Sequence, residues 1–232
     1  MNAMPRRGGE GVELVISWGL GVDSTAYLVK MLDDPAACGV DLARTVVLHQ
    51  LTGDEWPTTR AHAEQYVLPL LRERRVRLVQ VARASRGLEI GVMNDSRQPE
   101  NLIERGPWTM WDEYEAGGTV PQQGGIRLCS LHAKGEVGDA WIEREIGDRP
   151  FRQVMGFNAD EVGRSLRDQV ASKNPLRQGL YPLIDWAWGR AVRDVPVRAV
   201  RCDLGEELLQ LLLLPGVQGS YGHAPGPDAG PS

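Results

Sequence analysis

The sequence is short of cysteine and contains no long apolar run. Its three cysteines, Cys38, Cys129 and Cys202, are odd in number and far apart, which excludes a disulfide scaffold and is typical of a reducing compartment. No stretch reaches the roughly 20 apolar residues of a membrane-spanning helix. Residues 1–10 also lack the apolar core of a secretion signal. We therefore predict a cytoplasmic protein without a membrane partner.

An excess of positive charge is also absent. The 232 residues carry 26 Lys and Arg against 31 Asp and Glu, a formal charge of -5, so the chain generates no general field for polyanions. Nucleic acid is not indicated as a partner, although a local basic patch is compatible with one. The length suits a single α/β domain with a sizeable core, or one domain plus an appendage, and no feature of the sequence sets an oligomeric state.

A strand, a loop and a helix near the N-terminus organise the rest of the chain. Residues 12–16 are an apolar run, residues 17–25 form a turn with two glycines, and residues 26–32 are apolar with helical spacing. Such a pattern predicts a buried strand, a tight loop and a helix. Gly19 and Gly21 can adopt positive φ and allow a ligand to approach the backbone closely.

The start of this helix is suited to an anion. Its first amides have no acceptor within the helix, and phosphate is the usual ligand at such a terminus. Asp23, Ser24 or Thr25 can cap it. Two common phosphate motifs are absent, because the loop has neither Gly-Lys-Ser/Thr nor the third glycine of the dinucleotide fingerprint. A strand-to-helix turn without a ligand is the alternative interpretation.

Strand and helix patterns continue to alternate along the chain. Residues 46–49, 76–81 and 151–156 have strand character, and helical patterns lie between them. This order predicts an α/β fold with a parallel, helix-covered sheet of about five strands. In such a sheet the ligand site lies at the carboxyl ends of the strands.

Three segments fall outside this alternation. Residues 1–11 are predicted to be a flexible lead, and residues 85–125 a lid-like excursion within a nucleotide-binding domain that spans residues 12–195. Residues 196–232 are an atypical C-terminal segment, which ends in a glycine- and proline-rich stretch and is predicted to be disordered from about residue 216.

Five short motifs follow one another along the chain. The first is Ser-x-Gly-x-Gly-x-Asp-Ser-Thr at residues 17–25, and the second is Thr-Gly-x-Glu-x-Pro-x-Thr at residues 52–59. Arg-x-Cys-Ser-x-x-x-Lys occupies residues 127–134, and Gly-x-x-x-Asp-Glu-x-x-Arg occupies residues 156–164. The last is Tyr-Pro-Leu-x-x-Trp at residues 181–186. Their common order is more specific than any one of them.

Together these motifs resemble the ATP pyrophosphatase (PP-loop) superfamily, in its phosphoadenosine-phosphosulfate-reductase-like branch, over about residues 12–190. The resemblance implies an adenine nucleotide alpha hydrolase-like fold, of the HUP-type, Rossmann-like class. The chain departs from the family pattern at Leu20, where glycine is common, and at Leu51, where aspartate is usual. The role of that aspartate would pass to Asp54 or be absent.

The resemblance also implies a set of site residues. Those that would bind ATP are Ser17, Gly19, Gly21, Asp23, Ser24, Thr25, Thr52, Gly53, Glu55, Gly156, Asp160, Glu161 and Arg164. Asp23, Arg127 and Lys134 would be catalytic, with the two cations neutralising phosphate or the leaving pyrophosphate. Asp23 or Asp160 would bind magnesium. In the alternative interpretation, Arg127 and Lys134 are two surface cations on a helix, and Asp160 caps the helix that follows it.

Three functions are consistent with these residues. The first is an adenylating enzyme that cleaves ATP to AMP and pyrophosphate to activate an acceptor, including for sulfur transfer. The second is a sulfonucleotide reductase that uses the thiol of Cys129 or Cys202. The third is a nucleotide-binding protein without turnover. We favour the first because the cysteine-bearing tail of the reductases is missing. An adenine nucleotide is the predicted partner, and the acceptor substrate is left unidentified.

Overall fold

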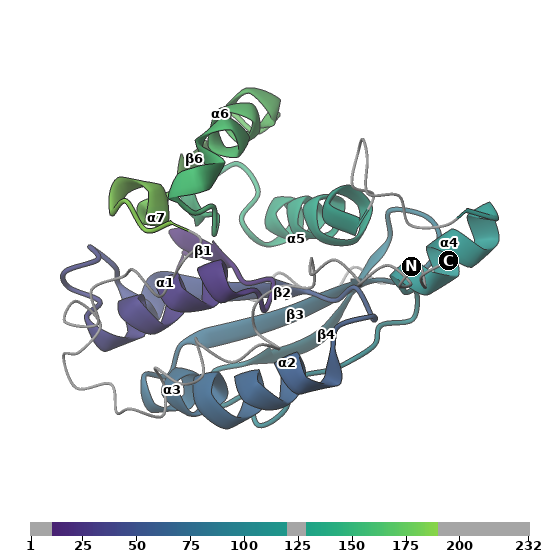
Figure 1. Ribbon diagram of the computed structural model, residues 1–232, viewed down its shortest axis with the longest axis horizontal. Helices are drawn as coiled ribbons and strands as arrows, with labels where there is room; N and C mark the ends of the chain where they lie inside the picture. The colour runs from purple at the N-terminus through teal and green to yellow at the C-terminus, as the bar shows by residue number, and fades with distance from the viewer. Residues whose placement is uncertain (1–10, 120–128, 190–232) are drawn as a thin grey trace, which may run out of the picture.

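The computed structural model describes residues 11–119 and 129–189, which form a six-stranded sheet with helices on both faces (Figure 1). The strand order is β4-β3-β2-β1-β5-β6, and every neighbouring pair is parallel except β3 and β4. The strands are β1 (Leu14–Ser17), β2 (Thr45–Gln50), β3 (Arg77–Arg83), β4 (Ile90–Ser96), β5 (Phe151–Val154) and β6 (Arg177–Leu180).

Most connections between the parallel strands contain helices. The α-helices are α1 (Val22–Asp33), α2 (Pro57–His62), α3 (Leu68–Glu73), α4 (Met110–Gly117), α5 (Glu136–Glu145), α6 (Val162–Ala171) and α7 (Pro182–Asp185). Short 3-10 helices are η1 (Leu42–Arg44) and η4 (Ala159–Glu161), and wider π-helices are η2 (Ala63–Val67) and η3 (Cys129–Gly135). None of the described helices is long and apolar enough to cross a membrane.

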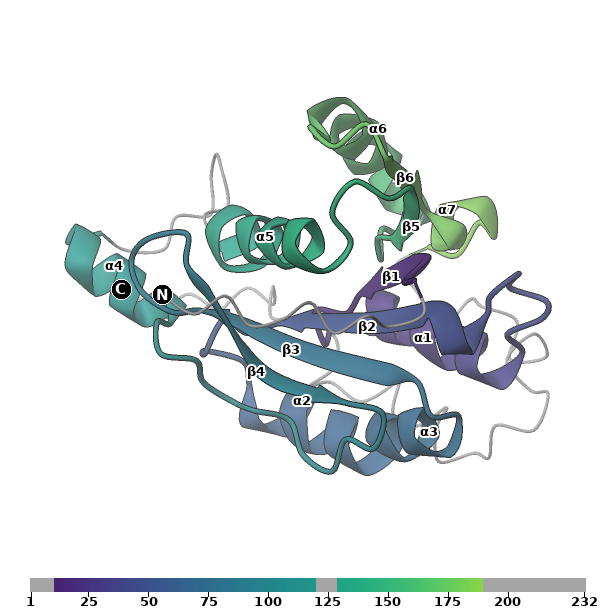
Figure 2. The ribbon, with the colours of Figure 1, turned by 180° about the vertical axis from the view of Figure 1, so that it is seen from behind.

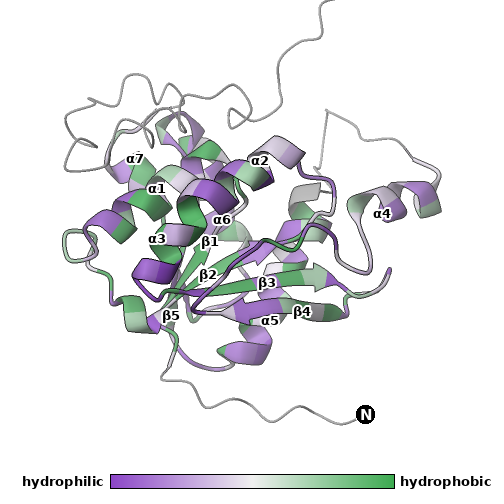
Figure 3. Ribbon diagram, turned by 90° about the horizontal axis from the view of Figure 1, so that it is seen from below, coloured by the Kyte–Doolittle hydropathy of each residue, from purple (hydrophilic) through white to green (hydrophobic). Residues whose placement is uncertain are grey.

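Two hydrophobic cores hold the helices against the sheet. On one face, buried side chains of α1, η2, α3 and α7 pack on β1 and β2; on the other, α5 packs on β1, β2, β3 and β5. Figures 1 and 2 show α5 on the side of the sheet opposite α2 and α3. All six residues of β2 are buried, which explains why a continuous apolar run rather than an alternating one marks a central parallel strand. The central strands are largely hydrophobic in Figure 3.

The predicted α/β class and the strands near residues 12–16, 46–49, 76–81 and 151–156 are confirmed. The excursion at residues 85–125 is not without structure, however, because it contains β4 and α4. The sequence pattern of β4 is weak because its residues are exposed or only half-buried, and its second half is the polar segment Asn94–Ser96. A register shift near Gln80 further interrupts its pairing with β3.

The five parallel strands follow the order of a Rossmann-like sheet. From β1 the chain moves outward through β2 and β3, and it later returns to the other side of β1 with β5 and β6. The direction of winding therefore reverses between β1 and β5. At such a switch point the loops after the two strands diverge and leave a crevice at the carboxyl ends, which is where ligands of open α/β sheets bind.

Candidate functional site

Two loops meet at the switch point between β1 and β5. Gly156 follows β5 and lies against the first turn of α1, because a Cβ added at Gly156 would be 2.8 Å from both Cα and N of Ser24. Two residues later, Asn158 donates its side-chain amide to Asp23 Oδ2 at 3.1 Å. The first and fourth predicted motifs are thus brought together, although they are more than 130 residues apart in the chain.

The β1–α1 loop differs from its predicted details. Helix α1 begins at Val22 with Gly21 as its N-cap, so none of Asp23, Ser24 and Thr25 is the capping residue. Neither glycine of the loop has positive φ; Gly21 is extended at φ -74°, whereas Leu20 adopts φ +58°. The left-handed conformation therefore falls on the position where the family pattern has glycine. Burial of the Leu20 side chain, which is 5% exposed, offsets this strain.

Lys134 extends from η3 to the same loop. Its Nζ would lie 3.3 Å from a Cβ added at Gly19, so a larger residue at position 19 would crowd the ammonium group. Nζ also pairs with Glu55 Oε1 at 3.3 Å, and the Thr52 hydroxyl donates to that same oxygen at 3.2 Å. The second and third predicted motifs thus place a cation beside the loop, with a carboxylate that holds it there.

His49 supports this arrangement from the interior. Its Nδ1 lies 2.9 Å from the Trp18 carbonyl oxygen, which can only accept, so Nδ1 carries the proton. Burial is the main cause that lowers the pKa of His49 to about 4; the charge of Lys134 acts in the same direction, and the hydrogen bond to Trp18 acts against it. A neutral imidazole thus fixes the backbone at the point where β1 ends, directly before Gly19. The sequence gives little signal for this role, because a lone histidine in an apolar strand has many uses.

Ser17 is oriented from the β5 side of the site. Its Oγ accepts a hydrogen bond from Gln153 Nε2 at 2.9 Å, which leaves the hydroxyl proton for a ligand oxygen. Gln153 accepts in turn from Arg177, which is paired at 2.7 Å with Asp168. This chain of polar side chains crosses β1, β5 and β6. It was missed in the sequence because its members lie at unrelated spacings.

Three predicted nucleotide residues occupy other positions. The Thr25 hydroxyl accepts from the buried Trp18 indole at 3.0 Å, and its backbone amide donates to Gly21, so Thr25 stabilises the loop from within. Arg164 pairs with Glu161 and lies 4.5 Å above the ring of Phe157. Of the interactions in the described chain, no hydrogen bond or ion pair connects Glu161 or Arg164 with the β1–α1 loop.

The other predicted residues are placed less directly. Asp160 lies near Gly189 within η4, whose cap is the Asn158 side chain. The alternative in which Asp160 caps the next helix is wrong, because the N-cap of α6 is Glu161. Arg127 lies outside the described residues, as does Cys202. The backbone of Cys129 begins η3. Cys38, the free thiol of the described chain, lies beyond the far end of α1, and burial raises its pKa.

The turn after β2 connects the site to the excursion. Gly53 has φ +82°, and a Cβ there would lie 2.4 Å from the Thr109 side chain, so the turn requires glycine for both reasons. Asp54 accepts from the backbone amide of Trp111 at 3.0 Å. Its carboxylate therefore holds the start of α4.

A pocket adjoins this turn at the carboxyl ends of β2 and β3. It is a hollow that is partly open to solvent. Its lining comes from the turn after β2, the end of β3, the start of α4 and η3: Leu51, Thr52, Arg83, Trp108, Thr109, Met110, Glu113, Tyr114, His132 and Ala133. The structure thus places Trp108 of the predicted excursion in this wall.

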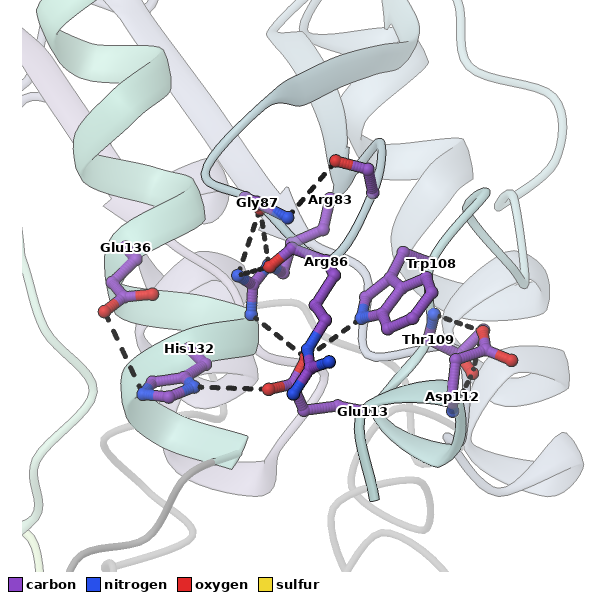
Figure 4. A network of polar contacts seen from close by, with 10 residues as sticks. Arg83, Arg86, Gly87, Trp108, Thr109, Asp112, Glu113, His132 and Glu136 are labelled. Carbon is purple, nitrogen blue, oxygen red and sulfur yellow. Dashed lines mark hydrogen bonds and ion pairs between the residues drawn. The ribbon is translucent and has the colours of Figure 1, made fainter. Parts of the chain in front are cut away.

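A polar network surrounds one side of the pocket (Figure 4). Glu113 Oε2 accepts from the Trp108 indole at 3.0 Å and lies 3.7 Å from the Arg83 guanidinium. Arg83 also donates to the carbonyl oxygens of Arg86 and Gly87. His132 lies between two carboxylates, 4.0 Å from Glu113 and 4.0 Å from Glu136.

Two carboxylates near the β1–α1 loop are candidates for metal ligands. Mg²⁺ is commonly held by one or two carboxylates together with substrate phosphates. Asp23 lies in the first turn of α1, which follows β1, and Asp160 lies in η4, which follows β5. No group of three or more His, Cys, Asp or Glu that could hold a metal occurs within residues 11–119 and 129–189.

Comparisons with known proteins add no further assignment. No family model matches the chain, and neither a curated protein nor a solved structure matches it.

Proposed function

We propose that the protein is an ATP-dependent adenylating enzyme of the PP-loop type, with an adenine nucleotide alpha hydrolase-like fold. An acceptor oxygen would attack the α phosphorus of ATP while the bond from that phosphorus to the bridging oxygen breaks. Pyrophosphate would leave with the electron pair, and the acceptor would carry AMP. This reaction requires positioning and charge neutralisation more than a dedicated base.

The observation that carries the proposal is the meeting of Lys134 with the β1–α1 loop at the switch point. The first turn of α1 supplies amides directed toward the loop, Ser17 has a hydroxyl proton to donate, and the Lys134 ammonium lies beside Gly19. These groups together favour a polyphosphate over a neutral ligand. Arg127, which precedes η3 in the chain, is proposed as a second cation for the leaving pyrophosphate.

Magnesium would enter as its complex with ATP and reduce the charge of the phosphate oxygens. Asp23 is the first candidate among the protein ligands, and Asn158 orients its carboxylate. Asp160 is the second. Glu55 has a different role, because its pairing with Lys134 holds the cation in position.

Substitution of Lys134 tests the proposal. Binding of Mg²⁺ with the α,β-methylene analogue of ATP, measured by calorimetry, is expected to weaken at least tenfold in Lys134→Met, since a charge-assisted contact contributes about 1.5–3 kcal/mol. Lys30→Met is the matched control, because Lys30 lies in the last turn of α1, at the end away from the site.

The products of ATP identify the reaction. AMP and pyrophosphate are expected from the wild-type protein, slowly with water as acceptor, and their formation should fall in Lys134→Met. ADP and phosphate as products, equal losses in the two lysine variants, or no affinity for MgATP would each refute the proposal.

A sulfonucleotide reductase is the second candidate, because Cys129 begins the π-helix that carries Lys134. Formation of sulfite from a sulfonucleotide and a thiol, lost in Cys129→Ser, would favour this candidate over adenylation. Nucleotide binding without products in either assay would leave the third function, that of a binding protein.

A further inference from the structure

The pocket beside the turn after β2 has a mainly apolar wall. Its walls are mainly apolar and aromatic: Leu51, Trp108, Met110, Tyr114 and Ala133 all line it. Such side chains favour a flat apolar body, since indole and phenol rings stack on other rings and methionine adapts to their edges.

The charged side chains of the wall are already matched with one another. Arg83 is only 8% exposed, and it donates to two backbone carbonyls and faces Glu113. Glu113 has the indole N–H of Trp108 as its hydrogen-bond donor. A charged ligand would have to lose its hydration without gaining an uncommitted counter-charge from this pair (Figure 4). An uncharged ligand pays no such penalty.

The pocket is held in shape before any ligand enters. The Met110 amide donates to the Thr52 carbonyl at 2.9 Å, and the Arg105 guanidinium donates to the Gly53 carbonyl at 3.1 Å. The Trp108 amide donates to the Arg83 carbonyl at 3.3 Å, which attaches the segment before α4 to the end of β3. A preformed cavity of this kind reduces the ordering cost of binding.

Two residues connect the pocket with the proposed triphosphate site. Thr52 lines the pocket, while its hydroxyl donates to the same Glu55 oxygen that pairs with Lys134. Ala133 lines the pocket and directly precedes Lys134 on η3. The pocket therefore lies on the β2–β3 side of Lys134, whereas Gly156 and Asn158 approach the loop from the β5 side.

We infer that this pocket binds the acceptor substrate and that the acceptor carries an uncharged aromatic ring, which enters between Trp108 and η3. The inference rests on the proposed function, because an acceptor is required only if ATP is cleaved. The ring would be held on one side of Lys134 and the nucleotide on the other, which places the acceptor next to the phosphates.

Three compounds with one ring and different charges test the inference: benzamide, benzoate and benzylamine. Their affinities for the full-length protein are measured by NMR titration at pH 8. Benzamide is expected to bind at least tenfold more tightly than either charged analogue. Glu113→Gln retains an acceptor for the Trp108 indole but leaves Arg83 unmatched, so the affinity for benzoate is expected to rise at least tenfold, with that for benzamide little changed. Because this variant gains an affinity, misfolding does not reproduce the result.

Two further arms separate this inference from the proposed function. Adenosine is not expected to displace benzamide. If adenosine does displace benzamide, the pocket binds the nucleotide base, and the assignment of the pocket to the acceptor is overturned. If MgATP binds and depends on Lys134 but benzamide has no advantage over its charged analogues, the acceptor inference fails and the proposed function stands. If benzamide binds as expected and MgATP does not, the proposed function fails, and with it the assignment of the ring to an acceptor.

Discussion

Replacement of Leu20 by glycine and by alanine tests whether the β1–α1 loop is strained. At ordinary φ, glycine is less favourable than alanine because it loses more backbone freedom on folding. At φ +58° the order reverses, because the Cβ of any L-residue meets its own backbone there. Leu20 is the only residue of the loop between β1 and α1 in this conformation, so the comparison addresses a single backbone position.

The magnitudes follow from burial and from backbone strain. Both variants lose a side chain that is 5% exposed within the core under α1, which costs about 2–5 kcal/mol of unfolding free energy. The left-handed conformation costs alanine about 1–2 kcal/mol that glycine does not incur. Leu20→Gly should therefore be more stable than Leu20→Ala by about 1 kcal/mol.

The control is the same pair of substitutions at Leu28, which is fully buried within α1. There, glycine should be less stable than alanine by about 1 kcal/mol. Urea unfolding of the four variants gives both differences. A Leu20→Gly protein less stable than Leu20→Ala would show that the loop is not strained at this position and would refute the reasoning.

Two further predictions concern the support of the site. Because the pKa of His49 is lowered to about 4 in the folded protein, the unfolded chain binds a proton that the folded chain excludes. The free energy of unfolding should therefore fall by about 3 kcal/mol as the pH drops from about 6.5 to 4. Urea unfolding at a series of pH values should show a shallower decline for His49→Gln than for the wild-type protein. Parallel declines in the two proteins would contradict a neutral buried imidazole. Gly156→Ala would place a Cβ 2.8 Å from the Ser24 backbone, which should cost about 1–3 kcal/mol and weaken MgATP binding. The control is Gly163→Ala in α6, where an added Cβ has no atom within 4 Å. This variant should be neutral or more stable by up to about 1 kcal/mol. Equal changes of melting temperature in the two variants would argue against the close contact at Gly156.

The sequence was sufficient to predict the central part of the fold. Buried parallel strands leave uninterrupted apolar runs, such as Val46–Leu48, and the glycine-containing turn after residue 16 indicates where strand gives way to helix. It did not predict β4, whose edge position allows polar residues on both faces. It also placed the helix cap too late, because Gly21 caps α1 through its backbone conformation alone, without a side-chain signal.

The candidate site was predictable only in part, for a related reason. Residues within one motif, such as Ser17 and Asp23, were found from their spacing. Asn158, Gln153 and His49 act across strands, and their partners are set by the sheet register, which no local pattern encodes.

The antiparallel strand β4 has a consequence for solubility during folding. A sheet that ended at β3 would offer seven consecutive, mostly apolar residues with open backbone groups to another chain. In the described chain this edge is covered by β4, which carries the polar residues Asn94 and Asp95 and pairs with β3 through a shifted register. Polar groups and broken regularity deter edge-to-edge growth. The strand that breaks the parallel order thus shields the sheet from self-association.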